Sequence, residues 1–317
     1  MINARRTTLL AALSLGWLLV IGAANTADGQ RRRDYDRDSR SNIDTSFAFD
    51  RRGLVSLTIG SGDIVVTAWD RDQIRVHATS ESGGVRLDAS NARVSVELSN
   101  RYGGGGDSRF EVTVPTGVRI IARAQSGDIA ISGTQGEVDA RSQSGDIKVD
   151  DVVNRLDIGT LSGDIEVHNA MGDVQIKSVS GDIRLTDFKG DFEGETVSGS
   201  IDLRNAVARS VRSHTTSGDL SYEGSIDPSG RYELSAHSGD IRLGIPSNAS
   251  AQLSVSTWSG ALESDFPITL RPGEHGIGTG QAKRFTFDIG GGAARISAET
   301  FSGDITISSR GSSRRDR

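Results

Sequence analysis

Apolar and polar residues alternate with a period of two along most of the chain between residues 45 and 309. Ile147 and Val149, and then Leu156 and Ile158, show the pattern: every second residue is apolar. This period is typical of β-strands that bury one face. No stretch of 45–309 sustains a helical period, so the pattern predicts an all-β domain.

The tetrapeptide Ser-Gly-Asp-Ile, or a close variant, recurs at nearly constant spacing. Its serines stand 18, 18, 18, 18, 19, 21, 21 and 43 residues apart, at positions 126, 144, 162, 180, 198, 217, 238, 259 and 302. A fixed period near 20 residues predicts a solenoid. A weaker motif around Gly136, Gly172 and Gly190 divides each unit into two strand-plus-turn halves, and Ser61 begins an early, outlying copy.

These patterns predict a single-stranded parallel β-solenoid, of β-helix or β-roll type, with about 18–21 residues per rung. Neighbouring rungs of such a stack lie about 4.8 Å apart. Residues 45–123 and 244–300 are less regular, and we assign them to capping and flanking strands, because solenoids need atypical ends. One domain is therefore expected over residues 45–309.

The repeated motif has a structural explanation in such a stack. Glycine permits a positive φ at a corner, the Asp side chain can accept a backbone N–H, and the next residue enters the core. We interpret the following residues as a structural turn ladder: Gly127, Asp128, Gly145, Asp146, Gly163, Asp164, Gly181, Asp182, Gly218, Asp219, Gly239 and Asp240. Two residues before each motif serine runs a column of small residues that we expect to point inward: Ala124, Ser142, Thr160, Ser178, Thr196, Thr215, Ala236, Thr257 and Thr300.

Two further columns are expected to point outward. The first alternates in charge over four rungs (Lys148, Glu166, Arg184, Asp202), an order that favours cross-strand pairs and penalises a slipped register. The second lies one residue before the motif serine and becomes apolar and aromatic along the chain. We take its apolar part as the candidate binding surface: Leu161, Val179, Val197, His237, Trp258 and Phe301. The alternative is that a flanking segment, for example from 262–290, covers it.

Composition limits the class of protein. Apolar residues make up 35% of the chain and aromatic residues 5%, with 39 glycines and five prolines, which suits many tight turns rather than a wide core. The net charge of −6 disfavours nucleic-acid binding, which usually needs a basic face. The absence of cysteine excludes disulfides.

The N-terminus reads as an export signal over residues 1–24. Arg5 and Arg6 precede an uncharged apolar stretch, and Gly22-Ala23-Ala24 suits a cleavage site. An uncleaved anchor that keeps the protein near a membrane is the alternative. Residues 25–44 are polar and mixed in charge and predict a disordered linker, and 310–317 predict a disordered tail.

The ordered set of motifs resembles a bacterial family of unknown function called "putative adhesin". The features that carry the resemblance are GSGDIVVTAWD at 60–70, VPTG at 114–117, the central SGDI ladder and ETFSGDITI at 299–307. The chain departs from the pattern at Ser200 and Ala261, where the motif Asp is replaced. The resemblance implies an exported or membrane-tethered β-solenoid, and adhesion as its role.

Three other kinds of site are alternatives to this structural interpretation. The Asp ladder offers one acid per half-rung and lacks the GGxGxDxUx repeat of calcium-binding β-rolls, so turn capping is favoured over calcium binding and no metal is predicted. A glycosidase or lyase needs clustered acids and a groove, whereas the histidines at 77, 168, 214, 237 and 275 are scattered. Gly103–Gly106 and Gly290–Gly292 lack the Lys-Ser/Thr pair of a phosphate loop.

The sequence therefore predicts a non-enzymatic exported envelope, periplasmic or cell-surface protein, without cofactor, that presents a rigid adhesin-like face to an unidentified protein or surface glycan. A periplasmic sensory or scaffold domain in envelope-stress signalling is the first alternative. A β-helix carbohydrate-active enzyme is the second.

Overall fold

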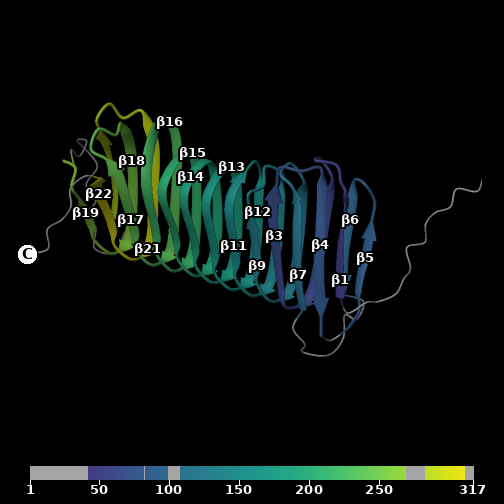
Figure 1. Cartoon of the computed structure of the whole chain (residues 1–317). Coiled ribbons are helices and arrows are strands. Elements are labelled where there is room, and N and C mark those ends of the chain that lie inside the picture. Colours follow the sequence, from purple (N-terminus) through teal and green to yellow (C-terminus); the bar gives the residue numbers. More distant parts are fainter. Residues whose placement is uncertain (1–41, 82, 99–107, 269–282, 311–317) are drawn as a thin grey trace, which may run out of the picture. The chain divides into compact units, whose positions relative to one another are not determined.

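The computed structural model describes residues 42–81, 83–98, 108–268 and 283–310, which lie within one compact unit, residues 37–317 (Figure 1). Every regular element in these residues is a β-strand, as the alternation predicts. Among the described residues, no helix has the length and apolarity needed to cross a membrane.

The strands lie side by side in two rows, which we call face A and face B, and the chain crosses from B to A at each Ser-Gly-Asp corner. Face A consists, in spatial order, of β1 (Asn42–Ala48), β4 (Gln73–Ser80), β7 (Ser108–Pro115), β3 (Asp63–Trp69), β9 (Ile129–Ser132), β11 (Ile147–Val153), the first halves of β13 (Ile165–Ser180), β14 (Ile183–Ser198), β15 (Ile201–Ser217) and β16 (Leu220–Ser238), then β17 (Ile241–Pro246), β22 (Ile305–Arg310) and β19 (Leu262–Ser264).

Face B is built in the same way. Its order is β5 (Val85–Ala89), β6 (Arg93–Leu98), β2 (Leu54–Ser61), β8 (Arg119–Ser126), β10 (Val138–Ser144), β12 (Leu156–Ser162), the second halves of β13 to β16, then β21 (Ala294–Ser302), β18 (Ala251–Ser259) and β20 (Lys283–Ile289). The parallel β-solenoid is thus confirmed.

Each rung is one face B strand, its corner and the following face A strand, and we name it by its motif serine. The rungs stack in the order Ser61, Ser126, Ser144, Ser162, Ser180, Ser198, Ser217, Ser238, Ser302 and Ser259. The early copy at Ser61 therefore lies directly on the Ser126 rung. The last copy in the sequence lies between the two that precede it. The 43 residues that separate it from Ser259 include the antiparallel strand β20.

The ends of the stack are closed by antiparallel strands, as expected for a solenoid. Strands β1, β4 and β5 lie at one end and β20 at the other. The assignment of 45–123 and 244–300 to caps was too broad, because residues 54–69 and 251–264 form regular rungs. Their motifs stack like the central ones, although long insertions separate them along the chain.

The domain limits differ slightly from the prediction. Strand β1 begins at Asn42, inside the predicted linker, because it pairs with β4 and packs Ile43 and Phe47 against the core. Strand β22 ends at Arg310 rather than at residue 309. The predicted signal (1–24), most of the linker and tail, and Gly103–Gly106 lie outside the described residues.

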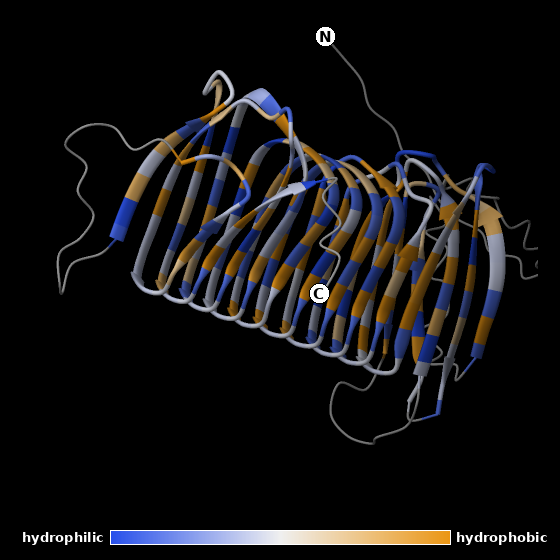
Figure 2. Cartoon of the chain, turned by 90° about the vertical axis from the view of Figure 1, so that its left-hand side faces the viewer, coloured by the Kyte–Doolittle hydropathy of each residue, from blue (hydrophilic) through white to orange (hydrophobic). Residues whose placement is uncertain are grey.

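The core between the two faces is made by the alternate apolar residues, visible as alternating colours along the strands in Figure 2. The predicted inward column of small residues is buried throughout. Several of its hydroxyls bond to a corner glycine of the adjacent rung: Thr300 donates to the Gly239 carbonyl at 3.0 Å and Thr215 to that of Gly199 at 3.0 Å. These bonds tie the narrow interior to the corners.

The alternating charge column is aligned as predicted, with Lys148, Glu166, Arg184 and Asp202 opposite one another in successive rungs. Arg184 and Asp202 have other partners, however. Arg184 pairs with the motif acids Asp182 at 2.7 Å and Asp164 at 3.3 Å. The corner carboxylates are closer to the guanidinium than the carboxylates along the column, so the predicted ladder of pairs is wrong for this residue.

Candidate binding face

The corner glycines approach the preceding rung more closely than any other residue type would allow. Those of the turn ladder have φ between 136° and 144°. A Cβ at Gly163 would lie 2.2 Å from the Gly145 carbonyl oxygen, and the other ladder glycines show distances of 1.9–2.2 Å. A side chain is therefore excluded both by the backbone conformation and by the neighbouring rung.

The motif carboxylates bond between rungs rather than within their own turn. Each ladder Asp accepts a hydrogen bond on Oδ1 from the backbone N–H at the same position of the next rung. Asp164 N–H donates to Asp146 at 2.8 Å, and Asp240 N–H donates to Asp219 at 2.9 Å. The series runs from the Asp63 carboxylate to the last corner, at Ala261.

The two departures from the motif fit this arrangement. Ser200 substitutes its hydroxyl for the carboxylate and accepts the Asp219 N–H at 3.2 Å. Ala261 lies on the last corner of the stack and donates its own N–H to Asp304 at 2.8 Å. Among the described residues, no further corner follows whose N–H a carboxylate at position 261 would accept. Lys283 closes this end by donating to the Gly260 carbonyl at 2.9 Å.

At some corners an arginine donates to the other carboxylate oxygen, Oδ2, of the motif aspartates. Arg242 donates to Asp219 at 2.8 Å and to Asp240 at 3.1 Å. Burial alone would raise the pKa of Asp219, but the bonds from Arg242 and from the Asp240 N–H outweigh it and hold that pKa below its usual value. Within the described ranges, no three His, Asp or Glu residues are grouped as metal ligands would be.

We expect replacement of Asp146 by alanine to lower the free energy of unfolding by about 1–2 kcal/mol, because it leaves the Asp164 N–H without its acceptor. Asp146→Asn keeps Oδ1 and should lose less than half as much. Urea unfolding followed by circular dichroism measures both. A fall in stability of the wild-type protein on adding a calcium chelator would instead identify the ladder as a metal site.

The candidate binding column lies outside, as predicted. Leu161 is 55% exposed, Val179 46% and Val197 47%, and each stands between a buried residue of the inward column and an exposed motif serine. His237 is exposed too, and Trp258 and Phe301 are 47% and 49% exposed. With Thr216 between Val197 and His237, the column spans seven rungs, or about 29 Å at 4.8 Å per rung.

The three rings form a stack whose order follows the rungs and not the sequence. Phe301 lies between His237, at 5.1 Å and 11° between ring planes, and Trp258, at 5.8 Å and 12°. The rings therefore cover one another's faces and present mainly their edges to solvent. Stacking on sugars, which needs a free ring face, is restricted to the ends of this stack.

A second exposed apolar column was missed in the sequence. Val153, Met171 and Val207 are 44%, 49% and 52% exposed and lie in register with Lys189 at the corner opposite the Ser-Gly-Asp edge. Just before them, Asp151, Asn169, Asp187 and Asn205 have φ of 52° to 58°, and Asn169 donates to Asp151 at 2.6 Å. The spacing of 18 residues in this Asp/Asn series is the signal that would have revealed the corner.

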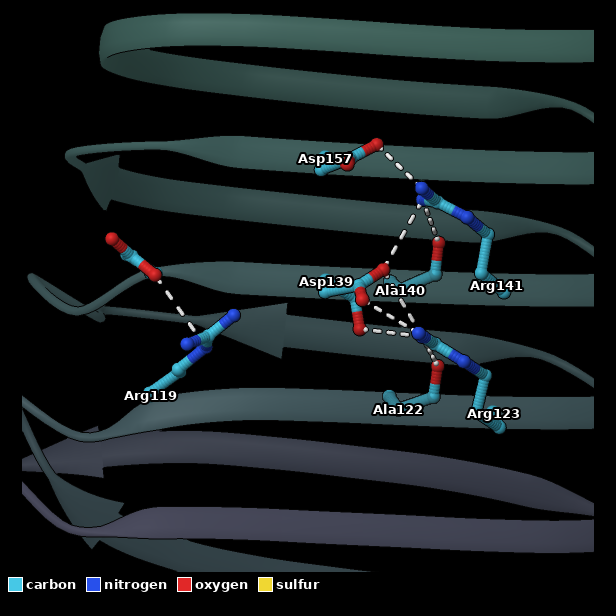
Figure 3. A network of polar contacts seen from close by, with 8 residues as sticks. Arg119, Ala122, Arg123, Asp139, Ala140, Arg141 and Asp157 are labelled. Atoms are coloured by element: carbon cyan, nitrogen blue, oxygen red, sulfur yellow. Dashed lines mark hydrogen bonds and ion pairs between the residues drawn. The ribbon is translucent and has the colours of Figure 1, made fainter.

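A network of ion pairs lies on face B, on the Ser126, Ser144 and Ser162 rungs, the last of which is where the binding column begins (Figure 3). Arg141 joins Asp139 at 3.3 Å and Asp157 at 2.6 Å, and Arg123 binds Asp139 at 2.5 Å. Gly159 makes room for the Arg141 side chain, which would lie 2.9 Å from a Cβ there. These half-buried charges pair with one another, so this part of face B is polar but its two arginines and two aspartates cancel in charge.

A surface depression of about 200 Å³ lies on face B. Its charged lining includes Asp191, Glu193 and Arg212. Asp191 accepts the Ser210 N–H at 3.2 Å, and Arg212 lies 4.0 Å from Glu193. The lining residues contain no histidine and do not pair a nucleophile with a base, so the depression gives no support to an enzymatic interpretation.

Comparison with known proteins gives structural relatives of low identity. A "putative adhesin" from Bacteroides fragilis is 11% identical over 85% of this chain and 98% of that one, with a TM-score of 0.37. A "putative cell adhesion protein" from Clostridium sporogenes (9%, 84% and 98%, TM-score 0.25) and a "putative lipid binding protein" from Parabacteroides distasonis (10%, 84% and 97%, TM-score 0.26) are similar too. No curated protein matches the chain.

The family model described as Toastrack DUF4097 matches residues 118–227 and 195–308. Together these segments cover more than half of the chain and contain nine of the ten corners, all but that at Ser61. The matched residues form these nine corners and the parts of the two faces from β8 onward. The chain belongs to the Toastrack DUF4097 family.

Proposed function

We propose that this protein is a non-enzymatic, exported binding module that contacts a protein partner through the column from Leu161 to Trp258. The observation that carries the proposal is the column of exposed side chains over seven successive rungs, which are aliphatic or aromatic on every rung except that of Thr216. Exposed apolar patches of this kind mark interaction sites on soluble proteins. Export is supported by the apolar stretch at Leu9–Ala24 behind Arg5 and Arg6.

The chemistry of the column favours a protein over a glycan. Its rings are stacked on one another, so they offer edges, while Leu161, Val179 and Val197 offer branched aliphatic groups. Such a surface is complementary to apolar side chains in a groove of a partner. The stack of hydrogen-bonded rungs beneath it keeps the column rigid, which lowers the entropic cost of binding.

The double variant Val179→Asp, Trp258→Ser tests the proposal. Both side chains are half exposed, so the variant should keep its β-rich circular dichroism while partner capture falls at least tenfold. Capture is measured by crosslinking the purified protein to envelope fractions. Val207→Asp, on the second apolar column, is the matched control and should capture normally.

Equal loss of capture in the control would place the contact elsewhere or show nonspecific adhesion. Capture that survives protease treatment of the fraction but not glycosidase treatment would identify a glycan instead. Loss of folding in the double variant would mean that the column is a covered part of the core.

A further inference from the structure

The rung that comes last in the sequence is enclosed on both sides. On face B, β21 lies between β16 and β18, and on face A, β22 lies between β17 and β19. Residues 294–310 thus separate two rungs that follow each other directly in the chain. The gap that they fill has the same register on both faces.

The inserted rung uses the same hydrogen bonds as every other rung. Toward the Ser238 rung, Gly239 N–H donates to the Ser302 carbonyl at 2.9 Å and Asp304 N–H donates to Asp240 at 2.9 Å. Toward the Ser259 rung, Gly303 N–H donates to the Ser259 carbonyl at 3.2 Å, and Ala261 N–H donates to Asp304 at 2.8 Å.

This equivalence allows a second register. The Gly239 N–H now donates to the Ser302 carbonyl, and the Asp240 carboxylate accepts the Asp304 N–H. The Ser259 corner offers the equivalent two groups, the Ser259 carbonyl and the Ala261 N–H. Among the described strands, β18 pairs with β20 and β21, and β19 pairs with β22. The ladder contacts of the Ser259 rung with the rest of the stack therefore run through the inserted rung.

We propose that the gap between the Ser238 and Ser259 rungs is a strand-accepting site, and that residues 294–310 of the same chain enter it last. Both flanking rungs precede this segment in synthesis. Before residues 294–310 are made, the Ser238 and Ser259 rungs therefore pair with each other. Insertion replaces the corner hydrogen bonds between the two flanking rungs by two sets, one from the inserted rung to each of them. The occupied state is the one that the structure shows.

Filling the site also assembles the aromatic end of the binding column. Phe301 enters with the rung and separates His237 from Trp258. In the alternative register these two residues would be neighbours, and Phe301 would be absent from the row. This consequence rests on the proposed function, but the site itself can be tested without any partner.

Cysteine pairs in the full-length chain, which has no cysteine of its own, report the register. Aligned positions on adjacent rungs lie about 4.8 Å apart, within the Cα range of about 4.4–6.8 Å for a disulfide, whereas positions two rungs apart exceed it. Ser259→Cys with Ser302→Cys should form an intramolecular disulfide. Ser238→Cys with Ser259→Cys should remain reduced under the same mild oxidation.

Weakening the occupant should reverse this result. Gly303→Val places a side chain against the Gly239 carbonyl, 2.1 Å from the Cβ, and Ile305→Ala removes a buried side chain more gently. In either background the 238–259 disulfide should rise from undetectable to the major product, while the 259–302 disulfide declines. Non-reducing electrophoresis and peptide mass mapping identify the bonds.

Two results would overturn the proposal. If neither weakened background forms the 238–259 disulfide, the flanking rungs have no alternative register and the gap is not a separate site. If the 259–302 disulfide joins two chains, the occupant comes from a second copy. Failure of the binding test with normal disulfides would contradict the proposed function alone.

Discussion

Replacing Gly163 by alanine is expected to lower the melting temperature by about 10 °C. Residue 163 has φ of 137°, and the new Cβ would lie 2.2 Å from the Gly145 carbonyl oxygen. Backbone strain at such a conformation costs roughly 1–3 kcal/mol, and overpacking against the neighbouring rung costs roughly 1–3 kcal/mol more. Thermal unfolding followed by circular dichroism measures the change.

Gly60→Ala is the matched control. Gly60 also lies next to a Ser-Gly-Asp corner, but it is a strand residue whose added Cβ would meet no atom within 4 Å. Its effect should stay within about 0.5 kcal/mol. An unchanged melting temperature for Gly163→Ala would show that the corners can separate without cost, contrary to the close stacking seen here.

The pair Phe192 and Gly194 is expected to show strong coupling in a double-mutant cycle. Gly194 is buried, and a Cβ there would lie 2.5 Å from Cζ of Phe192. The same two inward positions of the preceding rung hold Val174 and Ile176. The glycine therefore compensates for the large ring within one rung.

Gly194→Ile alone should cost about 3 kcal/mol through overpacking, and Phe192→Val alone about 2 kcal/mol through a cavity. The double variant copies the preceding rung and should lose only about 1 kcal/mol, part of it from the edge contact between Phe192 and Phe188 at 6.3 Å. The coupling is then roughly 4 kcal/mol. Chemical denaturation of all four proteins gives this value.

Val207→Ala, which truncates an exposed side chain, should leave stability unchanged and so controls for general loss of apolar groups. Additive effects of the two single substitutions would mean that Phe192 moves away on its own, and that the glycine is not a compensation.

Much of the candidate site was predictable because its determinants are local. The alternation of period two identified Leu161 and Val179 as outward residues, and their exposure confirms this, although the motif serine that follows each of them is exposed as well and not buried. Whether they bind a partner stays a prediction. Asp151 and Asn169 were not predicted, although their side chains bond across the second corner, because isolated Asp and Asn residues are common in turns and only their spacing of 18 residues distinguishes this series.

The sequence by itself determined the rung, its two halves, the glycine corners and the side of each strand that faces the core. Each of these follows from backbone stereochemistry within a few residues. Only the tertiary structure decided which rungs are neighbours: that Ser61 lies on Ser126, and that Ser302 lies between Ser238 and Ser259. Since every corner offers the same hydrogen bonds, local chemistry cannot order the rungs, and the order, with the ring stack it creates, depends on the packing of the whole chain.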